Sequence, residues 1–359
     1  MKIIIFLISF LIIATTAFGA YAFISEEAFV MKELENGLIL EIDPVTEDII
    51  GIEVTNKFLI NTFELEESQI NLSILHTIRE EIGYGTKTYH RFRESELLDV
   101  IEPTLETEAL NSRYALLVDA QNGRVLVDKK STQKMYPASM TKIMTAIVAI
   151  ELLEASEELN ALVHLETEMF HYLYHQRASM AGFMPEERVP AIDLLYGIML
   201  PSGGESTLAI ARKVAGSEEA FVEKMNQKAR ELGLTQTNFT NPTGLHHPEH
   251  YTTLEEMVII LKYALTNEMF REIFTASTHT ASTNLTMTST LFRHLPRTTV
   301  KNGEILGGRT GFTPEAGRCL ISLAVINGRE YILATGGAEN TPENQIQHLL
   351  DALYIYDQL

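Results

Sequence analysis

A serine and a lysine three residues apart are the first candidates for chemistry in this chain. Ser139 lies where a polar loop gives way to an apolar segment, and Lys142 follows within one helical turn. At this spacing both side chains lie on one face of a helix. A serine hydroxyl is a weak nucleophile that needs a base beside it. A lysine can act as that base when burial and nearby cations lower its pKa. The pair therefore predicts nucleophilic catalysis, with Ser139 as the attacking group.

The same spacing occurs a second time, at Ser131 and Lys134. No apolar helix follows this copy, and we interpret it as a solvated loop. Ser-x-x-Lys is thus a weak signal when read alone. The alternative for Ser139 and Lys142 is a serine that caps a helix beside an exposed lysine.

Two further segments have residue types that suit the same chemistry. Ser202, in Leu-Pro-Ser-Gly-Gly-Glu, offers a second hydroxyl two residues before Gly204. In Gly-Gly-Arg-Thr-Gly-Phe, Arg309 is a permanent cation that binds carboxylates with two prongs, and Thr310 adds a hydroxyl. Glycines there let a ligand approach the backbone closely. Read separately, each segment has an ordinary alternative. Ser202 could simply cap a helix, and Arg309 could be a surface residue on a glycine-containing strand.

The elements that must position these residues include two predicted β-hairpins. Strands over 114–119 and 124–128 flank Asn122-Gly123, and strands over 318–326 and 330–335 flank Asn327-Gly328. Asn-Gly favours the positive φ angles of tight hairpin turns. A further strand is predicted over 305–311.

The hydrophobic patterns between and after these strands are helical. Helices are predicted over residues 141–154, 191–200, 206–215, 217–232, 253–266 and 342–357. The economical fold joins both hairpins into one antiparallel sheet flanked by helices. We therefore predict an α+β fold with an inserted helical lobe, preceded by an N-terminal extension.

Composition narrows the classes of function. Of 359 residues, 28 are Lys or Arg and 48 are Asp or Glu, which gives a net charge of −20. Such an acidic chain is a poor candidate for nucleic-acid binding. The one cysteine excludes an internal disulfide and a cysteine-based zinc site.

The N-terminus has the order of a secretory signal. Lys2 precedes an apolar run and then small residues. We predict a signal peptide or membrane anchor over 1–24, with membrane contact through 3–23 as the second possibility. Residues 25–106 form an extension of unknown role, with strand-like segments at 37–42 and 49–54, and residues 107–359 form the catalytic domain.

The three motifs together resemble the serine penicillin-binding proteins and β-lactamases, whose signatures come in this order. More closely, the chain resembles the D-alanyl-D-alanine carboxypeptidase family of low-molecular-weight penicillin-binding proteins. The segments that carry this resemblance are Tyr-Pro-Ala-Ser-Met-Thr-Lys at 136–142, Asp-Leu-Leu-Tyr-Gly-Ile-Met-Leu at 193–200, Asn-Pro-Thr-Gly-Leu at 241–245, His-Tyr-Thr-Thr at 250–253 and Gly-Arg-Thr-Gly-Phe-Thr-Pro-Glu-Ala-Gly at 308–317. The resemblance covers residues 107–357.

The resemblance implies an extracytoplasmic enzyme that removes the terminal D-alanine of peptidoglycan stem peptides through an acyl-enzyme on Ser139. It implies that Lys142 takes the serine proton and that Ser202 relays a proton to the leaving amine. It also implies that β-lactam antibiotics acylate the same serine, and that no metal or organic cofactor is needed.

The substrate-binding residues implied by the resemblance lie mostly in the third motif. Arg309 and Thr310 hold the terminal carboxylate, and Gly311 belongs to the same motif. The backbone N–H groups of Ser139 and Phe312 form the oxyanion hole.

Two positions depart from the family pattern. Gly204 stands where the family has asparagine, which removes an amide expected to position Lys142 and bind substrate. Arg309 stands where the family has lysine; it keeps the charge but does not readily shuttle a proton.

Two other functions stay open at this point. One is a β-lactamase, although no glutamate can be assigned to activate a deacylating water. The other is a catalytically weak protein that binds the cell wall, which Gly204 and the acidic extension suggest.

Overall fold

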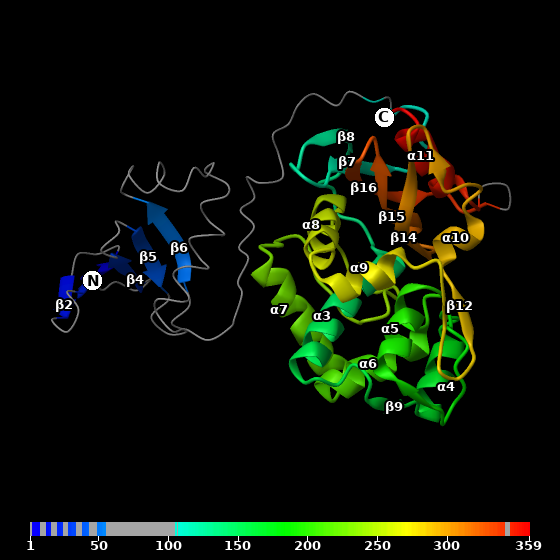
Figure 1. Cartoon of the computed structure of the whole chain (residues 1–359), viewed down its shortest axis with the longest axis horizontal. Helices are drawn as coiled ribbons and strands as arrows, with labels where there is room; N and C mark the ends of the chain where they lie inside the picture. Colours follow the sequence, from blue (N-terminus) through cyan, green and yellow to red (C-terminus); the bar gives the residue numbers. More distant parts are fainter. Residues whose placement is uncertain are drawn as a thin grey trace. The chain divides into compact units, whose positions relative to one another are not determined.

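The computed structural model describes residues 105, 107–341 and 345–359, together with the backbone of a six-stranded sheet between residues 2 and 54. The chain divides into two compact units, Met1–Thr88 and Tyr89–Leu359, and each is described by itself. Figure 1 shows the elements of both units.

The first unit contains one sheet of strand order β2-β3-β1-β4-β5-β6. Its strands are β1 (Lys2–Leu7), β2 (Ile12–Thr15), β3 (Ala20–Phe23), β4 (Ala28–Glu33), β5 (Leu38–Ile42) and β6 (Ile49–Val54). The last two coincide with the strands predicted from the sequence. Among the described residues, no helix is long and apolar enough to cross a membrane. The signal or anchor over 1–24 and the role of 25–106, which lies largely outside the described residues, stay predictions.

The second unit is built on a six-stranded antiparallel sheet of order β13-β14-β15-β16-β7-β8. Its strands are β7 (Tyr114–Asp119), β8 (Val125–Lys129), β13 (Thr299–Val300), β14 (Gly303–Thr313), β15 (Gly317–Ile326) and β16 (Arg329–Ala338). Both predicted hairpins are present, and β16 pairs with β7 to join them into one sheet. At the second turn, Asn327 and Gly328 have φ angles of 51° and 76°, as a tight hairpin requires.

Helices fill the chain between the two strand groups. They are η2 (Ala138–Thr141, a 3-10 turn), α3 (Lys142–Ala155), α4 (Thr167–His175), α5 (Ala191–Met199), α6 (Gly204–Ala215), α7 (Glu218–Glu231), α8 (Leu254–Ala264), α9 (Glu268–Thr275) and α10 (Thr290–His294), with α11 (Gln347–Tyr356) near the end of the chain. Two short ribbons, β9 (Leu162–His164) with β10 (Arg188–Pro190) and β11 (Thr278–Thr280) with β12 (Thr286–Thr288), complete the unit. Helices α4, α9 and α10 were not predicted from the sequence.

Two apolar cores lie on opposite faces of the sheet. The larger core joins one face to the inserted helices, and the smaller one packs α11 on the other face. Helix α3 is the centre of the lobe, because every residue from Lys142 to Ile150 is buried. The Ser-x-x-Lys motif at 139–142 therefore leads directly into the buried first turn of this helix. The predicted α+β fold with an inserted helical lobe is confirmed.

Candidate active site

The serine of the first motif lies in η2, the turn that leads into α3. The preceding residue, Ala138, has a left-handed φ of 46°, which is costly for a residue with a side chain. The Thr141 hydroxyl donates to the Ala138 carbonyl at 2.7 Å and closes this turn. Ser139 itself is partly exposed, so its hydroxyl is accessible from outside.

A hydrogen bond joins the first and second motifs. The Ser202 hydroxyl lies 3.1 Å from the Ser139 Oγ, although 63 residues separate the two serines. Ser202 also has a left-handed φ, of 74°, and is buried. A non-glycine residue held in this conformation marks a loop whose shape is imposed by its surroundings.

The third motif reaches the same point through Arg309. Its Nε donates to the Ser139 carbonyl at 3.1 Å, its Nη1 to the Met199 carbonyl at 3.1 Å, and its Nη2 to the Ser202 hydroxyl. The side chain is completely buried, and burial lowers the pKa of the guanidinium to about 9. These donors point at protein oxygens, so direct binding of a substrate carboxylate by Arg309 stays a prediction.

Lys142 is buried below the serine pair, with 3% of its surface exposed. Its Nζ donates to the Thr243 carbonyl at 2.5 Å, and no hydrogen bond to Ser139 is present among the described residues. Burial, followed by the charge of Arg309, holds the pKa of Lys142 well below its usual range, while the Glu205 carboxylate opposes this shift. An amine in this setting is suited to accept a proton.

Gly204 lies at the start of α6, in a position closed to larger residues. Its N–H donates to the Ser179 carbonyl at 2.7 Å. A Cβ added here would lie 2.7 Å from Cδ2 of Leu173 and 3.3 Å from the Ser179 carbonyl oxygen. Leu173 and the Ser179 backbone therefore occupy space that the first atoms of an asparagine side chain would need.

The neighbouring Glu205 was not identified as a site residue from the sequence. It is fully buried, and its Oε1 accepts the backbone N–H groups of Ala181, Gly182 and Phe183 at 2.7, 2.8 and 3.3 Å. Its Oε2 has no hydrogen-bond partner among the described residues, and burial raises the pKa of this carboxyl. Glu205 thus holds the 181–183 loop against the second motif.

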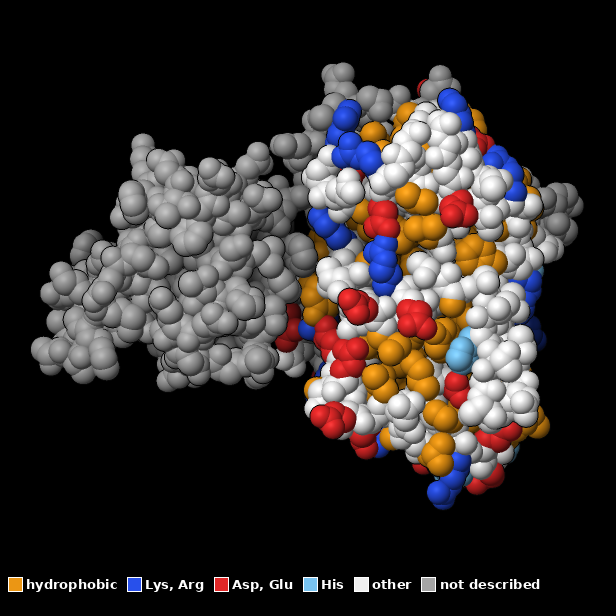
Figure 2. Space-filling view, viewed as in Figure 1, with side chains coloured by type: hydrophobic (Ala, Val, Ile, Leu, Met, Phe, Trp, Pro, Cys, Tyr) orange, Lys and Arg blue, Asp and Glu red, His pale blue; other side chains and the backbone are white. Residues whose placement is uncertain are grey.

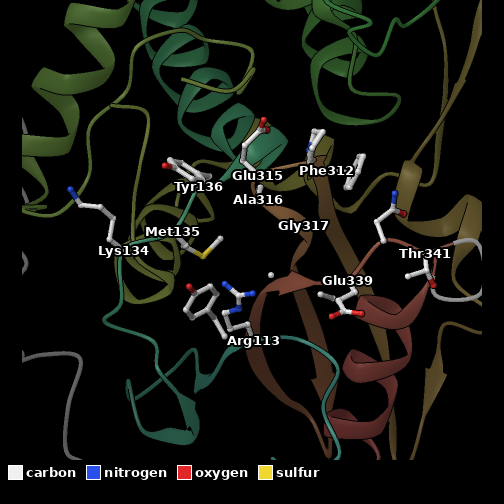
Figure 3. A pocket seen from close by; sticks show the side chains of 15 residues that line it. Arg113, Lys134, Met135, Tyr136, Phe312, Glu315, Ala316, Gly317, Glu339 and Thr341 are labelled. Carbon is white, nitrogen blue, oxygen red and sulfur yellow. The ribbon is translucent and has the colours of Figure 1, made fainter. Parts of the chain in front are cut away.

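The rest of the third motif lies along β14. The Thr310 hydroxyl is 2.8 Å from that of Thr290 on α10. At Gly311 a Cβ would lie 3.0 Å from the Ser139 backbone nitrogen, so a side chain here would crowd the turn that carries Ser139. Phe312 is 39% exposed and lines a pocket (Figure 3).

A buried histidine contacts the turn that carries Ser139. The Nδ1 of His250 accepts the Thr240 N–H at 3.1 Å, and its Nε2 lies 2.8 Å from the Thr141 hydroxyl. Burial lowers the pKa of His250 to about 3, so the ring is neutral. No group of residues suited to hold a metal ion is present in the described part of the chain. His250 is therefore a packing and hydrogen-bonding residue.

The second Ser-x-x-Lys copy differs from its prediction in one respect. Lys134 is exposed, but Ser131 is buried, with 3% exposure. The Ser131 carbonyl accepts the N–H of Leu254 at 3.0 Å, which draws the serine under the start of α8. Ser131 makes no hydrogen bond with Ser202 or Arg309 among the described residues.

Comparison with known proteins gives one family. The profile of the peptidase S11 family, described as D-alanyl-D-alanine carboxypeptidase, matches residues 101–340. The carboxypeptidase DacF of Bacillus subtilis is 32% identical over 260 residues, which are 68% of this chain and 62% of that protein. The carboxypeptidase DacC of Escherichia coli is 34% identical over 164 residues, 45% of this chain and 41% of that protein. The chain thus spans less than two thirds of the length of these relatives.

Solved structures show the same fold. The Streptomyces K15 DD-transpeptidase superposes with a TM-score of 0.61 at 25% identity, over 70% of this chain and 97% of that one. The D-alanyl-D-alanine carboxypeptidase of Mycobacterium tuberculosis gives a TM-score of 0.61 at 25% identity, over 72% and 94% of the two chains. All the residues brought together around Ser139 lie within the matched family region.

Proposed function

Because this chain belongs to the peptidase S11 family of D-alanyl-D-alanine carboxypeptidases, we propose that it removes the terminal D-alanine from peptidoglycan stem peptides through an acyl-enzyme on Ser139. The observation that carries the proposal is the convergence of three distant motifs. Ser202 lies 3.1 Å from the Ser139 hydroxyl, and Arg309 donates to both serines.

Lys142 is the proposed general base. Its amine is buried and its pKa is held well below the usual range, so it is more readily neutral, and able to take the Ser139 proton, than an ordinary lysine. The Thr243 carbonyl accepts a hydrogen bond from Nζ at 2.5 Å, so the proposed proton transfer requires Nζ to leave this carbonyl and turn to the Ser139 hydroxyl. The Ser139 oxygen then bonds to the peptide carbonyl carbon, and the carbonyl becomes an oxyanion.

Ser202 is the proposed proton donor to the leaving group. It stands between Ser139 and Arg309, which keeps its hydroxyl oriented toward the reacting centre. It passes its proton to the D-alanine nitrogen as the peptide bond breaks and takes back the proton that Lys142 had accepted from Ser139. Water then hydrolyses the acyl ester, which releases the shortened peptide and restores the Ser139 hydroxyl. Arg309 adds a fixed positive charge that stabilises the developing negative charge.

The remaining proposed contacts follow from β14. The backbone N–H groups of Ser139 and Phe312 stabilise the oxyanion, because Gly311 places the strand against the nucleophile turn. The Thr310 hydroxyl binds the free carboxylate within the positive field of Arg309. We propose that the protein works outside the cytoplasm, where stem peptides are found, and that residues 1–24 direct it there.

Mass spectrometry after incubation with penicillin tests the assignment. We expect one covalent adduct on the wild type and none on Ser139→Ala. The matched control is Ser131→Ala, which removes the serine of the other Ser-x-x-Lys copy and should still be acylated. An adduct on Ser139→Ala, or its loss in the control, would contradict the nucleophile.

Release of D-alanine from a peptide ending in D-Ala-D-Ala tests the reaction. We expect multiple turnovers by the wild type and none by Ser139→Ala. Rapid turnover of a chromogenic β-lactam without D-alanine release would favour a β-lactamase. Peptide binding with neither reaction would favour a cell-wall-binding protein.

A further inference from the structure

We propose that His279 and Asp193 form a positioning pair of the active site, which fixes the β11–β12 ribbon to helix α5. Through this ribbon the pair sets the place of the Thr290 hydroxyl, which orients Thr310 in the third motif. Among the described residues, neither member of the pair makes a hydrogen bond with Ser139. The inference rests on the proposed function, in which the Thr310 hydroxyl binds the free carboxylate of the substrate.

The pair lies between the first strand of the ribbon and α5. The Nε2 of His279 is 2.7 Å from Oδ1 of the buried Asp193. Its Oδ2 accepts the N–H of Ser282 at 2.8 Å, so the carboxylate holds the ribbon both in its first strand and in its turn. Burial acts to raise the pKa of Asp193, but the hydrogen bonds of His279 and Ser282 hold it below its usual value. The carboxyl group is therefore ionised and accepts from both donors.

An aromatic ring fixes the plane of the histidine. The rings of His279 and Tyr196 are stacked, with 3.8 Å between their centroids and 2° between their planes. Tyr196 and Asp193 are three positions apart on α5, so their side chains lie on one face of this helix. The Tyr196 hydroxyl donates to Glu272 of α9 at 2.9 Å. The imidazole is thus held at its edge by Asp193 and on its face by Tyr196.

The paired strands of the ribbon connect His279 to the far end of the ribbon. His279 pairs with Met287 in antiparallel register, and the Met287 side chain is buried. The Ser289 N–H donates to the Ser277 carbonyl at 2.9 Å and closes the base of the ribbon. Strand β12 then leads into α10 (Figure 1). A shift of β11 along α5 therefore displaces Ser289 and the residue that follows it.

That residue, Thr290, joins the ribbon to both the second and the third motif. Its N–H donates to the carbonyl of Leu200, two residues before Ser202, at 2.9 Å. Its hydroxyl lies 2.8 Å from that of Thr310, and both side chains are partly exposed. A hydroxyl has one proton and two lone pairs, so a Thr310 that accepts from Thr290 keeps its own proton for a substrate carboxylate.

The turn of the ribbon packs against a loop of the second motif. A Cβ on Gly182 would lie 3.3 Å from Cδ1 of Leu285, which belongs to this turn. The N–H of Gly182 is one of the three that donate to the buried Glu205. The ribbon therefore contacts the surroundings of the second motif at its turn and the third motif at its base. His279 anchors the stretch between these two contacts.

Steady-state kinetics of full-length variants tests the positioning role. The substrates are an N-acylated peptide that ends in D-Ala-D-Ala and its C-terminal amide, which lacks the carboxylate that Thr310 binds. We expect His279→Ala to raise KM for the acid about 10-fold with little change in kcat. The kcat/KM for the amide should stay close to that of the wild type. A smaller folded fraction would lower kcat/KM equally for both substrates and leave their ratio unchanged.

Two more substitutions at this position separate the hydrogen bond from the ring stack. His279→Gln keeps a side-chain N–H for Asp193, whereas His279→Phe keeps a ring on Tyr196 without the donor. We expect the glutamine variant to retain most of the preference for the acid and the phenylalanine variant to lose it. Asp193→Ala should also lose it, and adding His279→Ala should cause no further loss, because both changes break one interaction.

The matched control is His164→Ala, which breaks another pair of a histidine and a carboxylate on a short ribbon. The Nε2 of His164 lies 3.0 Å from Oε2 of Glu186, and neither residue makes a hydrogen bond with Thr290 or Thr310 among the described residues. This variant should keep the KM and the acid preference of the wild type. A wild-type preference in His279→Ala, or an equal loss in His164→Ala, would overturn the inference.

The proposed function fails in a different measurement. A wild type that forms no penicillin adduct and releases no D-alanine would defeat the proposed function and this inference with it. A wild type that forms the adduct and releases D-alanine, together with His279 and Asp193 variants that share its acid preference, would defeat the positioning pair alone.

Discussion

At the scale of single residues, the buried side chain of Arg309 connects the motifs of the site. Arg309 is fully buried, and its hydrogen bonds go to two carbonyls and the Ser202 hydroxyl. An arginine supplies this fork of donors from one planar group, which the single nitrogen of a lysine cannot match. The arginine at this position thus ties the turn that carries Ser139 to the second motif. Lys142 is the proposed proton acceptor of the site.

The pH dependence of acylation should follow Lys142. The lysine acts as a base only when neutral, and its neutral fraction grows as pH rises through its lowered pKa. We expect the rate of penicillin acylation to rise with pH and to level off well below the usual pKa of a lysine. Stopped-flow measurement of adduct formation across pH checks this.

Lys142→Arg provides the control for this profile. Arginine keeps the positive charge but does not give up its proton in this range, so acylation should fall about 10²- to 10⁴-fold. A variant with a wild-type rate, or a wild-type profile that is flat with pH, would rule out the lysine as the base.

Glu205 gives a prediction about the loop beside the site. Glu205→Ala leaves the N–H groups of 181–183 without their acceptor and should cost about 1–3 kcal/mol in the free energy of unfolding. Glu205→Gln keeps a carbonyl oxygen for these donors and should cost less. Urea unfolding of both variants, with hydrogen exchange of the loop amides, measures the difference. Equal losses in the two variants would mean that the hydrogen bonds do not hold the loop.

At the scale of elements, α4 and α6 together decide what the second motif can contain. Leu173 of α4 is fully buried and lies where a Cβ on Gly204 of α6 would point. The glycine is therefore matched to its neighbours in the packed interior. Restoring the family's asparagine requires a change on both helices.

A double-mutant cycle tests this match. Gly204→Asn alone should destabilise the protein by about 1–3 kcal/mol through overpacking. Leu173→Ala alone should also destabilise it, by about 2–5 kcal/mol through a cavity. If the two sites compete for one space, the double variant should lose less than the sum of the single losses. Additive losses in thermal or urea unfolding would show that the asparagine finds room elsewhere.

Most helices and strands of the second unit could be predicted from the sequence, because local sequence patterns mark them. Both hairpins were marked by Asn-Gly, and α3 by an apolar run behind the serine motif. Helix α9 has only 8 residues, too few for a clear periodic pattern, and α10 has 5. The start of α3 was off by one residue because Thr141 belongs to the 3-10 turn.

Residues of the candidate site could be predicted from the sequence only where they stand in a motif. Ser139, Ser202 and Arg309 stand in recognisable motifs, and the fold brings them together. The burial of Arg309 and the loop contacts of Glu205 depend on partners 22 to 170 positions away. Such contacts follow from tertiary packing, which no local pattern encodes.

At the scale of the whole molecule, two features matter: the net negative charge and the division of the chain into two compact units. The net charge of −20 agrees with the surface in Figure 2, where the described part of that face mixes acidic, basic and apolar side chains without an extended basic area. Both apolar cores and every candidate site residue lie in the unit Tyr89–Leu359. The catalytic chemistry should therefore be independent of the first unit.

A shortened chain that begins at Tyr89 tests this independence. It retains both cores and the complete sheet of β7, β8 and β13–β16, so we expect cooperative unfolding at a temperature close to that of the corresponding transition in the full chain. Penicillin should acylate Ser139 in both proteins at rates within about 3-fold of each other. Ser139→Ala in the shortened chain is the control and should give no adduct. A shortened chain that unfolds cooperatively but is acylated far more slowly would mean that residues 1–88 take part in the site.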